Sequence, residues 1–334
     1  MSICAECDAR KGGVGMNSED LKERARLNEL LRERILRRMP RPGQLATEIE
    51  GLKLTRREAV NQAENCFGTP CVAVIIQGEK CTLIGSREYR YGENQYIVTG
   101  VDMPSAFYVV NPRADRPFLA ASLDIDPYLL TQLAADVPPP AHAENRQCRG
   151  AAIGEAGPDM LDAFLRLMDV LDRPERREVL APMIIRELHY LLLIGPQGEN
   201  LRQLHTLGTR GNQIAQAIAW LKGNYRQTLQ VDALARRVHM ATSTFHRHFK
   251  EVTGLSPLQY HKRLRLYEAQ RLMLTEDHTA SSASLAVGYE SGTQFNREYK
   301  RLFGEPPHRD MAQRRFTSPE ARSHCSGQPG KRSV

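Results

Sequence analysis

The stretch that decides the fold is VDALARRVHMATSTFHRHFK, residues 231–250. Its first part places apolar side chains at helical spacing, at Val231, Leu234, Ala235 and Val238. A second helix is expected from about Ser243, because Phe245 and Phe249 are four positions apart and share one face. The residues between the two, 239–241, predict a tight turn. The stretch therefore predicts a helix-turn-helix unit.

A second unit of the same kind is predicted at residues 283–302, with a turn at 288–290 and a helix from Ser291. Between the two units, residues 257–274 predict a helix that begins after the N-cap residue Ser256. At 1.5 Å per residue this helix would be roughly 27 Å long. It could hold two DNA-reading helices about one DNA turn, ~34 Å, apart on one side of a duplex.

The solvent-facing positions of the two second helices carry the side chains that we expect to contact DNA. These are Ser243, Thr244, His246, Arg247, Lys250, Thr293, Asn296, Arg297 and Lys300. Arg247 and Arg297 are suited to guanine edges, which favours sequence-specific binding. The His246-Arg247-His248 run is not interpreted as a metal site, because adjacent helical positions point about 100° apart.

Residues 213–312 resemble the DNA-binding region of the AraC/XylS family of bacterial regulators. The second unit carries the closest match, through Ala286 to Ser291, Gln294 to Gly304, and Pro306-Pro307. The resemblance implies double-stranded promoter DNA as a partner, with RNA polymerase a further one if the chain is an activator. By position, six of these residues match the family's base-reading residues: Ser243, His246, Arg247, Thr293, Asn296 and Arg297.

The chain departs from the family pattern at two positions. His239 stands where the family usually has glycine, at a turn position that needs a positive φ, which histidine tolerates. Gly292 lies in the first turn of the second recognition helix. We interpret it as tolerance near a helix start in preference to close approach to DNA.

Charge divides the chain at the same place as the motifs. Residues 207–334 hold 20 Lys+Arg and 10 Asp+Glu, a net of +10, while residues 1–206 hold 26 and 29, a net of −3. A basic C-terminal half would neutralise phosphates and add affinity that does not depend on sequence.

The N-terminal half alternates short strand-like runs with turns. The runs are Cys71 to Gln77, Lys80 to Ile84, Tyr89 to Tyr91, Tyr96 to Val101, Ser105 to Val110 and Phe118 to Leu123. Gly78-Glu79 and Gly85-Ser86 are the two predicted hairpin turns. Helices are predicted at 19–38, 159–171 and 183–194. The predicted fold class is α+β, with a small antiparallel barrel or sandwich followed by an all-α double helix-turn-helix domain.

These patterns give the expected domain boundaries. They are a disordered tail at 1–17, a regulatory and dimerisation domain at 18–196, a linker at 197–212, the DNA-binding domain at 213–312 and a second disordered tail at 313–334. The chain is expected to form a homodimer through the apolar faces of 159–171 or 183–194.

Residues 66–127 also resemble the N-terminal domain of one branch of AraC-type regulators. The matching segments are Val72 to Lys80, Arg87 to Gly92 and Leu123 to Pro127. This resemblance implies a cupin-like effector or regulatory domain, so a small-molecule effector is a possible partner whose identity the motifs do not give. With the first resemblance, it covers most of the chain from about residue 24 to residue 312.

An enzyme is the disfavoured class. Cupin-like enzymes hold a metal through histidines, and the first histidine of this chain is His142, after the last predicted strand. No nucleophile or phosphate-binding glycine motif replaces it, so we expect no catalysis, no cofactor and no metal. Cys66, Cys71 and Cys81 are candidates for a redox sensor. The alternative interpretation is that they are small residues of the structural core. The Cys4-Ala5-Glu6-Cys7 motif is a weak metal signal.

The N-terminus lacks the pattern of a secretory signal, and no run of 18 apolar residues occurs, so we expect a cytoplasmic protein that does not insert into a membrane. Two classes of function stay open. The favoured one is a sequence-specific transcriptional regulator, and the other is an architectural DNA-binding protein with little base specificity.

Overall fold

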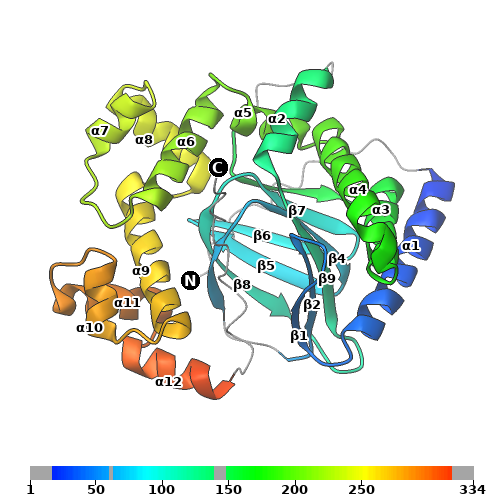
Figure 1. Ribbon diagram of the computed structural model, residues 1–334, viewed down its shortest axis with the longest axis horizontal. Helices are drawn as coiled ribbons and strands as arrows, with labels where there is room; N and C mark the ends of the chain where they lie inside the picture. The colour runs from blue at the N-terminus through cyan, green and yellow to red at the C-terminus, as the bar shows by residue number, and fades with distance from the viewer. Residues whose placement is uncertain (1–16, 60–62, 139–147, 318–334) are drawn as a thin grey trace, which may run out of the picture.

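The computed structural model describes residues 17–59, 63–138 and 148–317. They form a barrel of two antiparallel sheets with helices on both sides (Figure 1). The helices of the N-terminal half cover one side of the barrel, and the all-helical C-terminal half lies on the other (Figure 1). The predicted α+β fold class is confirmed.

The two sheets have six and four strands. The order in the larger sheet is β1 (Gly43–Ala46), β2 (Leu52–Arg57), β9 (Phe118–Asp124), β4 (Cys71–Gln77), β7 (Gln95–Thr99) and β10 (Ala151–Glu155). The order in the smaller sheet is β3 (Glu64–Gly68), β8 (Met103–Val110), β5 (Glu79–Ile84) and β6 (Arg87–Gly92). The six predicted runs are all strands, whereas β1, β2, β3 and β10 were not predicted.

One of the two predicted hairpin turns is confirmed and the other is wrong. Gly85-Ser86 joins β5 to β6, which pair antiparallel with Ile84 opposite Arg87. Gly78 instead lies where the chain leaves the larger sheet and enters the smaller one, because β4 pairs with β7 and β9 while β5 pairs with β6 and β8. Its φ of +86° allows this corner. A turn glycine predicts a change of chain direction, but it does not predict whether the two flanking strands pair with each other.

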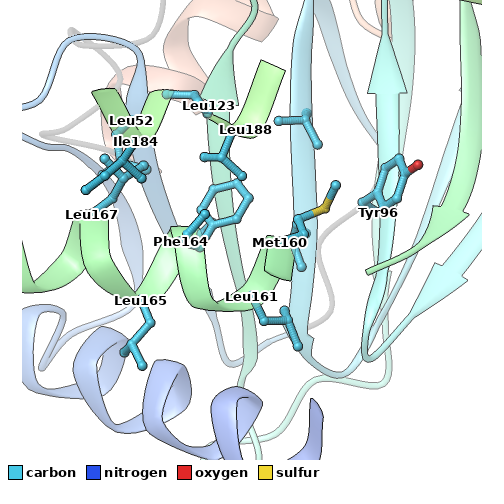
Figure 2. Close-up of a cluster of buried hydrophobic side chains, with 14 of the residues drawn as sticks. Leu52, Tyr96, Leu123, Met160, Leu161, Phe164, Leu165, Leu167, Ile184 and Leu188 are labelled. Atoms are coloured by element: carbon cyan, nitrogen blue, oxygen red, sulfur yellow. The ribbon is translucent and has the colours of Figure 1, made fainter. Parts of the chain in front are cut away.

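Among the residues that the structure describes, five helices belong to the N-terminal half: α1 (Ser18–Arg38), α2 (Pro127–Asp136), α3 (Pro158–Leu171), α4 (Pro174–Ile194) and α5 (Gly198–His205). Apolar side chains of α3 point at the outer face of the larger sheet and at α4 (Figure 2). Phe164 lies at the centre of this core and is fully buried. The alternation of β4 explains the contact, since Val72 and Val74 face these helices while Ile75 faces the inside of the barrel.

The predicted linker at 197–212 is wrong, because most of it is helical. Residues 198–205 form α5, and Leu201 and Leu204 are fully buried on it. α4 also begins at Pro174, nine residues before the predicted start, and continues through Pro182. Pro182 is exposed and is a residue that normally ends a helix, so the sequence pattern predicted a helix that begins only after it.

The described part of the C-terminal half has seven helices: α6 (Arg210–Gly223), α7 (Val231–Arg237), α8 (Thr242–Thr253), α9 (Pro257–Thr275), α10 (Ala280–Ala286), α11 (Gly292–Phe303) and α12 (Pro307–Thr317). α12 extends five residues beyond the predicted domain end at 312. Residues 1–16 and 318–334, most of the two predicted tails, lie outside the described residues.

Candidate nucleic-acid interface

The first recognition helix is α8. Phe245 and Phe249 are fully buried on its inner face, with ring centroids 5.4 Å apart. Gly254 ends the helix in the left-handed conformation with φ +73°, as its position predicts. Of the side chains predicted to contact DNA, Ser243, His246, Arg247 and Lys250 are exposed and Thr244 is half-buried.

The second recognition helix is α11. It begins after Ser291, whose side chain accepts a hydrogen bond from the Gln294 backbone NH at 3.3 Å. Phe295 and Tyr299 are buried on its inner face. The side chains predicted to contact DNA, Thr293, Asn296, Arg297 and Lys300, are all exposed. Contact of these side chains with bases stays a prediction.

The turns before the two recognition helices differ as the sequence indicates. His239 has φ +56°, so the predicted positive φ is confirmed. The second turn has Gly288 at φ +87°, and a Cβ there would lie 2.2 Å from the Arg226 carbonyl oxygen. Only glycine fits this second position, since both the backbone angle and the neighbouring chain exclude a side chain.

Glu298 connects three parts of the second unit, a role that the sequence did not indicate. Its carboxylate accepts hydrogen bonds from Tyr289 Oη at 2.7 Å and from Lys262 Nζ at 2.8 Å. Gln294 Nε2 donates a third at 3.2 Å. Burial alone would raise the pKa of Glu298, but these hydrogen bonds lower it. Tyr289 lies in the turn and Lys262 on α9, so Glu298 fixes the recognition helix relative to both.

The spacer helix α9 has 19 residues, which makes it about 28 Å long. It begins with a capping box, in which Ser256 and Gln259 each bind the other's backbone NH. Arg265 on this helix donates to the carbonyl oxygens of Tyr225, Arg226 and Gln227. These hydrogen bonds hold the loop that precedes the first helix-turn-helix unit against the spacer helix α9.

The barrel holds the carboxyl-terminal ends of both recognition helices. Arg87 Nη1 donates to the Glu251 carbonyl oxygen at 3.1 Å, and the Gly150 NH donates to that of Val252 at 2.9 Å. Asn65 Nδ2 donates to the carbonyl oxygen of Leu302 near the end of α11 at 3.4 Å. The exposed base-reading faces and the barrel contacts thus lie on different parts of the two helices.

The spacer helix also contacts the barrel directly. Tyr260 Oη donates to the Asp102 carbonyl oxygen at 2.8 Å, and Tyr267 Oη donates to that of Ser105 at 3.1 Å. The Phe67 ring of β3 lies between them, 5.9 Å from each tyrosine ring. Side chains of the barrel and of the first helix-turn-helix unit share one core.

The three candidate redox cysteines do not form one cluster. Cys66 Sγ lies 3.0 Å from Ser105 Oγ, and Cys71 Sγ lies 3.6 Å from Thr99 Oγ1. Cys81 alternates to the opposite face of its sheet, where its thiol donates to Glu88 at 3.1 Å. Burial raises the pKa of the Cys71 and Cys81 thiols, which disfavours reactive thiolates there. Cys4 and Cys7 lie outside the described residues.

Within the described ranges, no group of three or more His, Cys, Asp or Glu side chains is placed to hold a metal ion. No single helix of this part of the chain is long and apolar enough to cross a membrane. α4 and α5, bent by 105°, meet that length and composition only as a pair.

Comparison with known proteins gives a match for each half. Residues 48–200 match the family model of the AraC-type transcriptional regulator N-terminus, and residues 234–313 match that of a helix-turn-helix domain. The chain is 26% identical over 179 residues to the HTH-type transcriptional activator RhaS of Pectobacterium carotovorum, which is 53% of this chain and 62% of that protein. It is 27% identical over 121 residues to the HTH-type transcriptional regulator ArgR of Pseudomonas aeruginosa, 36% of this chain and 37% of that protein. The chain therefore spans less than two thirds of the length of these relatives.

The fold is similar to that of ToxT from Vibrio cholerae. Apo ToxT gives a TM-score of 0.55 at 8% identity, over 80% of this chain and 99% of that chain. The unsaturated fatty acid-bound form gives 0.52 at 9% identity, over 78% and 93%. The N-terminal and helix-turn-helix matches follow one another in the order that the sequence motifs predict, and each half of the chain is similar to the corresponding part of AraC-type transcriptional regulators.

Proposed function

We propose that this chain is a sequence-specific DNA-binding transcriptional regulator whose N-terminal half senses a signal, dimerises, or both. The observation that carries the proposal is the pair of recognition helices, which expose polar faces and are joined by one spacer helix of about 28 Å. RhaS is named an activator. RNA polymerase is accordingly a partner in the proposal if this chain activates.

Footprinting across the chain's own upstream region would identify a site. Competition at fixed salt then separates the proposal from the architectural alternative. A regulator should prefer its site over unrelated DNA by on the order of 10³ or more. A ratio near unity would favour an architectural DNA-binding protein.

Single substitutions test the proposed register on DNA. Arg247→Ala and Arg297→Ala should each cost ~1 to 3 kcal/mol of binding free energy at the site and relax the base preference there. Arg113→Ala is the matched control, because its side chain is 67% exposed on a barrel loop. If both recognition-helix variants kept full affinity and base preference, the register would be wrong.

For self-association we favour α4 over α3. Nine residues of α3 are buried within the N-terminal core, so its apolar face is already covered. α4 leaves Val179 65%, Met183 63%, Tyr190 40% and Ile194 47% exposed. These four lie at i, i+4, i+11 and i+15, on one face of the helix. This exposed apolar stripe on α4 supports docking of another chain there.

The stripe has the symmetry that a second copy of the chain would need. Its midpoint lies between Arg186 and Glu187. In an antiparallel pair of α4 helices, Val179 would face Ile194, Met183 would face Tyr190, and Arg186 would face Glu187 of the second copy. A two-fold axis requires such reciprocal contacts. In sedimentation of the full chain we expect a dimer that Met183→Glu converts to monomer, while the control Leu207→Glu, 77% exposed beyond α5, stays dimeric. A wild-type monomer at micromolar concentration would contradict the assignment.

A further inference from the structure

The two helix-turn-helix units meet at one joint beside the spacer helix. The joint consists of the loop 224–230 ahead of α7, the middle of α9, and the turn 288–290 ahead of α11. Figure 1 shows α9 running between the two units, with α7 and α8 at one end and α10 and α11 at the other. Contacts across this joint connect segments that are far apart in the sequence. They therefore bear on how the two recognition helices are oriented relative to each other.

Arg265 of α9 holds the loop of the first unit. Its Nε donates to the Tyr225 carbonyl oxygen at 2.7 Å, and its Nη2 donates to those of Arg226 and Gln227 at 3.0 and 2.9 Å. His261 Nε2, one turn earlier on α9, lies 2.9 Å from the same Tyr225 oxygen. Three successive carbonyl oxygens thus converge on one guanidinium. The planar fork of arginine suits this arrangement, whereas the ammonium of lysine is a single point of contact.

The turn of the second unit lies against the same residues. A Cβ on Gly288 would lie 2.2 Å from the Arg226 carbonyl oxygen and 3.1 Å from Arg265 Nη2. The Arg265 guanidinium also lies over the ring of Tyr289, with Cζ 5.9 Å from the ring centroid. Arg265 therefore contacts both units at once.

Tyr289 continues the joint to the second recognition helix. Its Oη donates to Glu298 Oε2 at 2.7 Å, and Lys262 Nζ of α9 donates to Glu298 Oε1 at 2.8 Å. Burial lowers the pKa of the Arg265 guanidinium, and the nearby Tyr289 and Glu298 oppose this shift. A continuous set of contacts thus runs from the loop of the first unit through Arg265 and Tyr289 to α11.

Tyr225 adds an apolar contact to the polar ones. Its partly buried side chain packs against the core that contains Phe245 and against the core that contains Phe295. Its hydroxyl group lies 3.4 Å from Glu268 Oε1 on α9. The hydrogen bonds described here all lie within residues 225–298, so this joint belongs to the helical half itself.

We propose that Arg265 is a positioning residue that joins the two DNA-reading units into one rigid body. It would thereby set the distance between the two DNA segments that the chain binds together. This inference deepens the proposed function and rests on it. Two linked binding units bind more tightly than one when their spacing matches that of their sites, and the gain is lost when the geometry prevents both from binding. A rigid joint should therefore make the affinity depend steeply on the spacing of the two segments.

The test measures this dependence with the full-length protein. Affinities are compared for the footprinted site and for a copy with one base pair inserted at the centre of the footprint, between the two segments. The insertion moves one segment by ~3.4 Å along the duplex and rotates it by ~35° relative to the other. The wild type should bind the longer site at least about tenfold more weakly, because only one unit can then bind in register. This ratio of affinities is the spacing penalty.

Arg265→Lys removes the planar fork and keeps the charge, so the general attraction to phosphates is unchanged. The variant should reduce the spacing penalty at least about threefold, because the two units can then adjust to the longer site. Tyr289→Phe is a milder second variant, which keeps the ring under Arg265 and loses only the hydrogen bond to Glu298. It should reduce the spacing penalty in the same direction.

Arg271→Lys is the matched control. Arg271 also lies on α9 and is partly buried, but its partners Glu268 and Glu276 belong to the same helix and its C-cap. This variant should keep the wild-type spacing penalty. The penalty is a ratio measured on one sample, so a variant that only lowers the folded fraction weakens binding to both sites equally and leaves the ratio unchanged.

Three outcomes would overturn the inference. They are a wild type that tolerates the inserted base pair, Arg265→Lys and Tyr289→Phe variants that keep the wild-type penalty, and an Arg271→Lys variant that loses the penalty as Arg265→Lys does. Failure of the proposed function looks different. A wild type that selects no DNA site refutes the regulator itself. A wild type that selects its site and whose penalty does not depend on Arg265 leaves the regulator standing without this role for the arginine.

Discussion

Removal of two phenol hydroxyls should loosen the helical half from the barrel while leaving each half packed. In the double variant Tyr260→Phe/Tyr267→Phe the two hydrogen bonds to the Asp102 and Ser105 carbonyl oxygens are lost. The rings stay, and with them the packing of both tyrosines on Phe67. Burial raises the pKa of both phenols, so both are protonated donors over the whole neutral range.

The magnitude follows from the two contacts. An intramolecular hydrogen bond contributes a net ~0.5 to 1.5 kcal/mol to the free energy of unfolding. Tyr260 and Tyr267 are seven residues apart on α9, roughly 10 Å along the helix axis, so their effects should add. The double variant should therefore lose ~1 to 3 kcal/mol of the free energy of unfolding. This loss weakens the contact between the two halves.

The single tryptophan makes this loss measurable. Trp220 lies on α6, so its fluorescence reports the helical half, whereas far-ultraviolet circular dichroism reports the whole chain. In urea the wild type should unfold with coincident transitions, and in the double variant the Trp220 transition should move to lower urea and separate from the other. Tyr128→Phe is the control and should change nothing, because Tyr128 is 71% exposed on α2 and belongs neither to α9 nor to the exposed stripe of α4. Coincident transitions at the wild-type midpoint in the double variant would show that the two contacts do not couple the halves.

Three further predictions concern pH and the turns. Burial lowers the pKa of His205 and His261 to about 4, whereas histidines of the unfolded chain titrate near 6.5. The free energy of unfolding should therefore be highest above pH 6.5 and fall as the pH drops toward 4. Urea midpoints that stay constant across this pH range would contradict this prediction. Gly288→Ala should destabilise the second unit by more than ~1 kcal/mol and abolish its DNA contacts, because a Cβ would lie 2.2 Å from the Arg226 carbonyl oxygen. Gly292→Ala, with nothing within 4 Å of the added Cβ, should instead raise stability by up to ~1 kcal/mol and keep DNA affinity, and a loss of affinity in footprinting would mean that DNA approaches this backbone closely.

The helix-turn-helix units could be predicted because their signals are local. Ser256 and Ser291 are N-caps, Gly254 is a left-handed C-terminal residue, and His239 has the expected positive φ. Each of these depends on neighbours within a few residues of the same segment. The apolar spacing that indicated Phe245 likewise needs only the period of one helix.

The errors of the sequence interpretation have non-local causes. Whether Gly78 makes a hairpin depends on which strands pair, and the residues of β4 pair with residues 22 to 28 positions later in β7 and 42 to 53 positions later in β9. α5 is too short for a clear periodic pattern, and its burial of Leu204 depends on the packing of α6. The Glu298 network and the contact of Lys80 with the Phe107 ring arise from residues on separate elements, so no single stretch of sequence indicates them.

One wall of the barrel offers a physical route between the inside of the barrel and the DNA-reading helices. Strands β3 and β8 place Cys66 and Phe107 on the inside, beside Lys80. The same two strands present Phe67 and the Ser105 carbonyl oxygen to the tyrosines of α9. A signal that moved these two strands would therefore act on the spacer helix. It would shift the DNA-reading helices only if it favoured one of two arrangements of this wall over the other. Loss of the hydroxyl contacts should therefore weaken the effect of such a signal on DNA binding more than it weakens DNA binding itself.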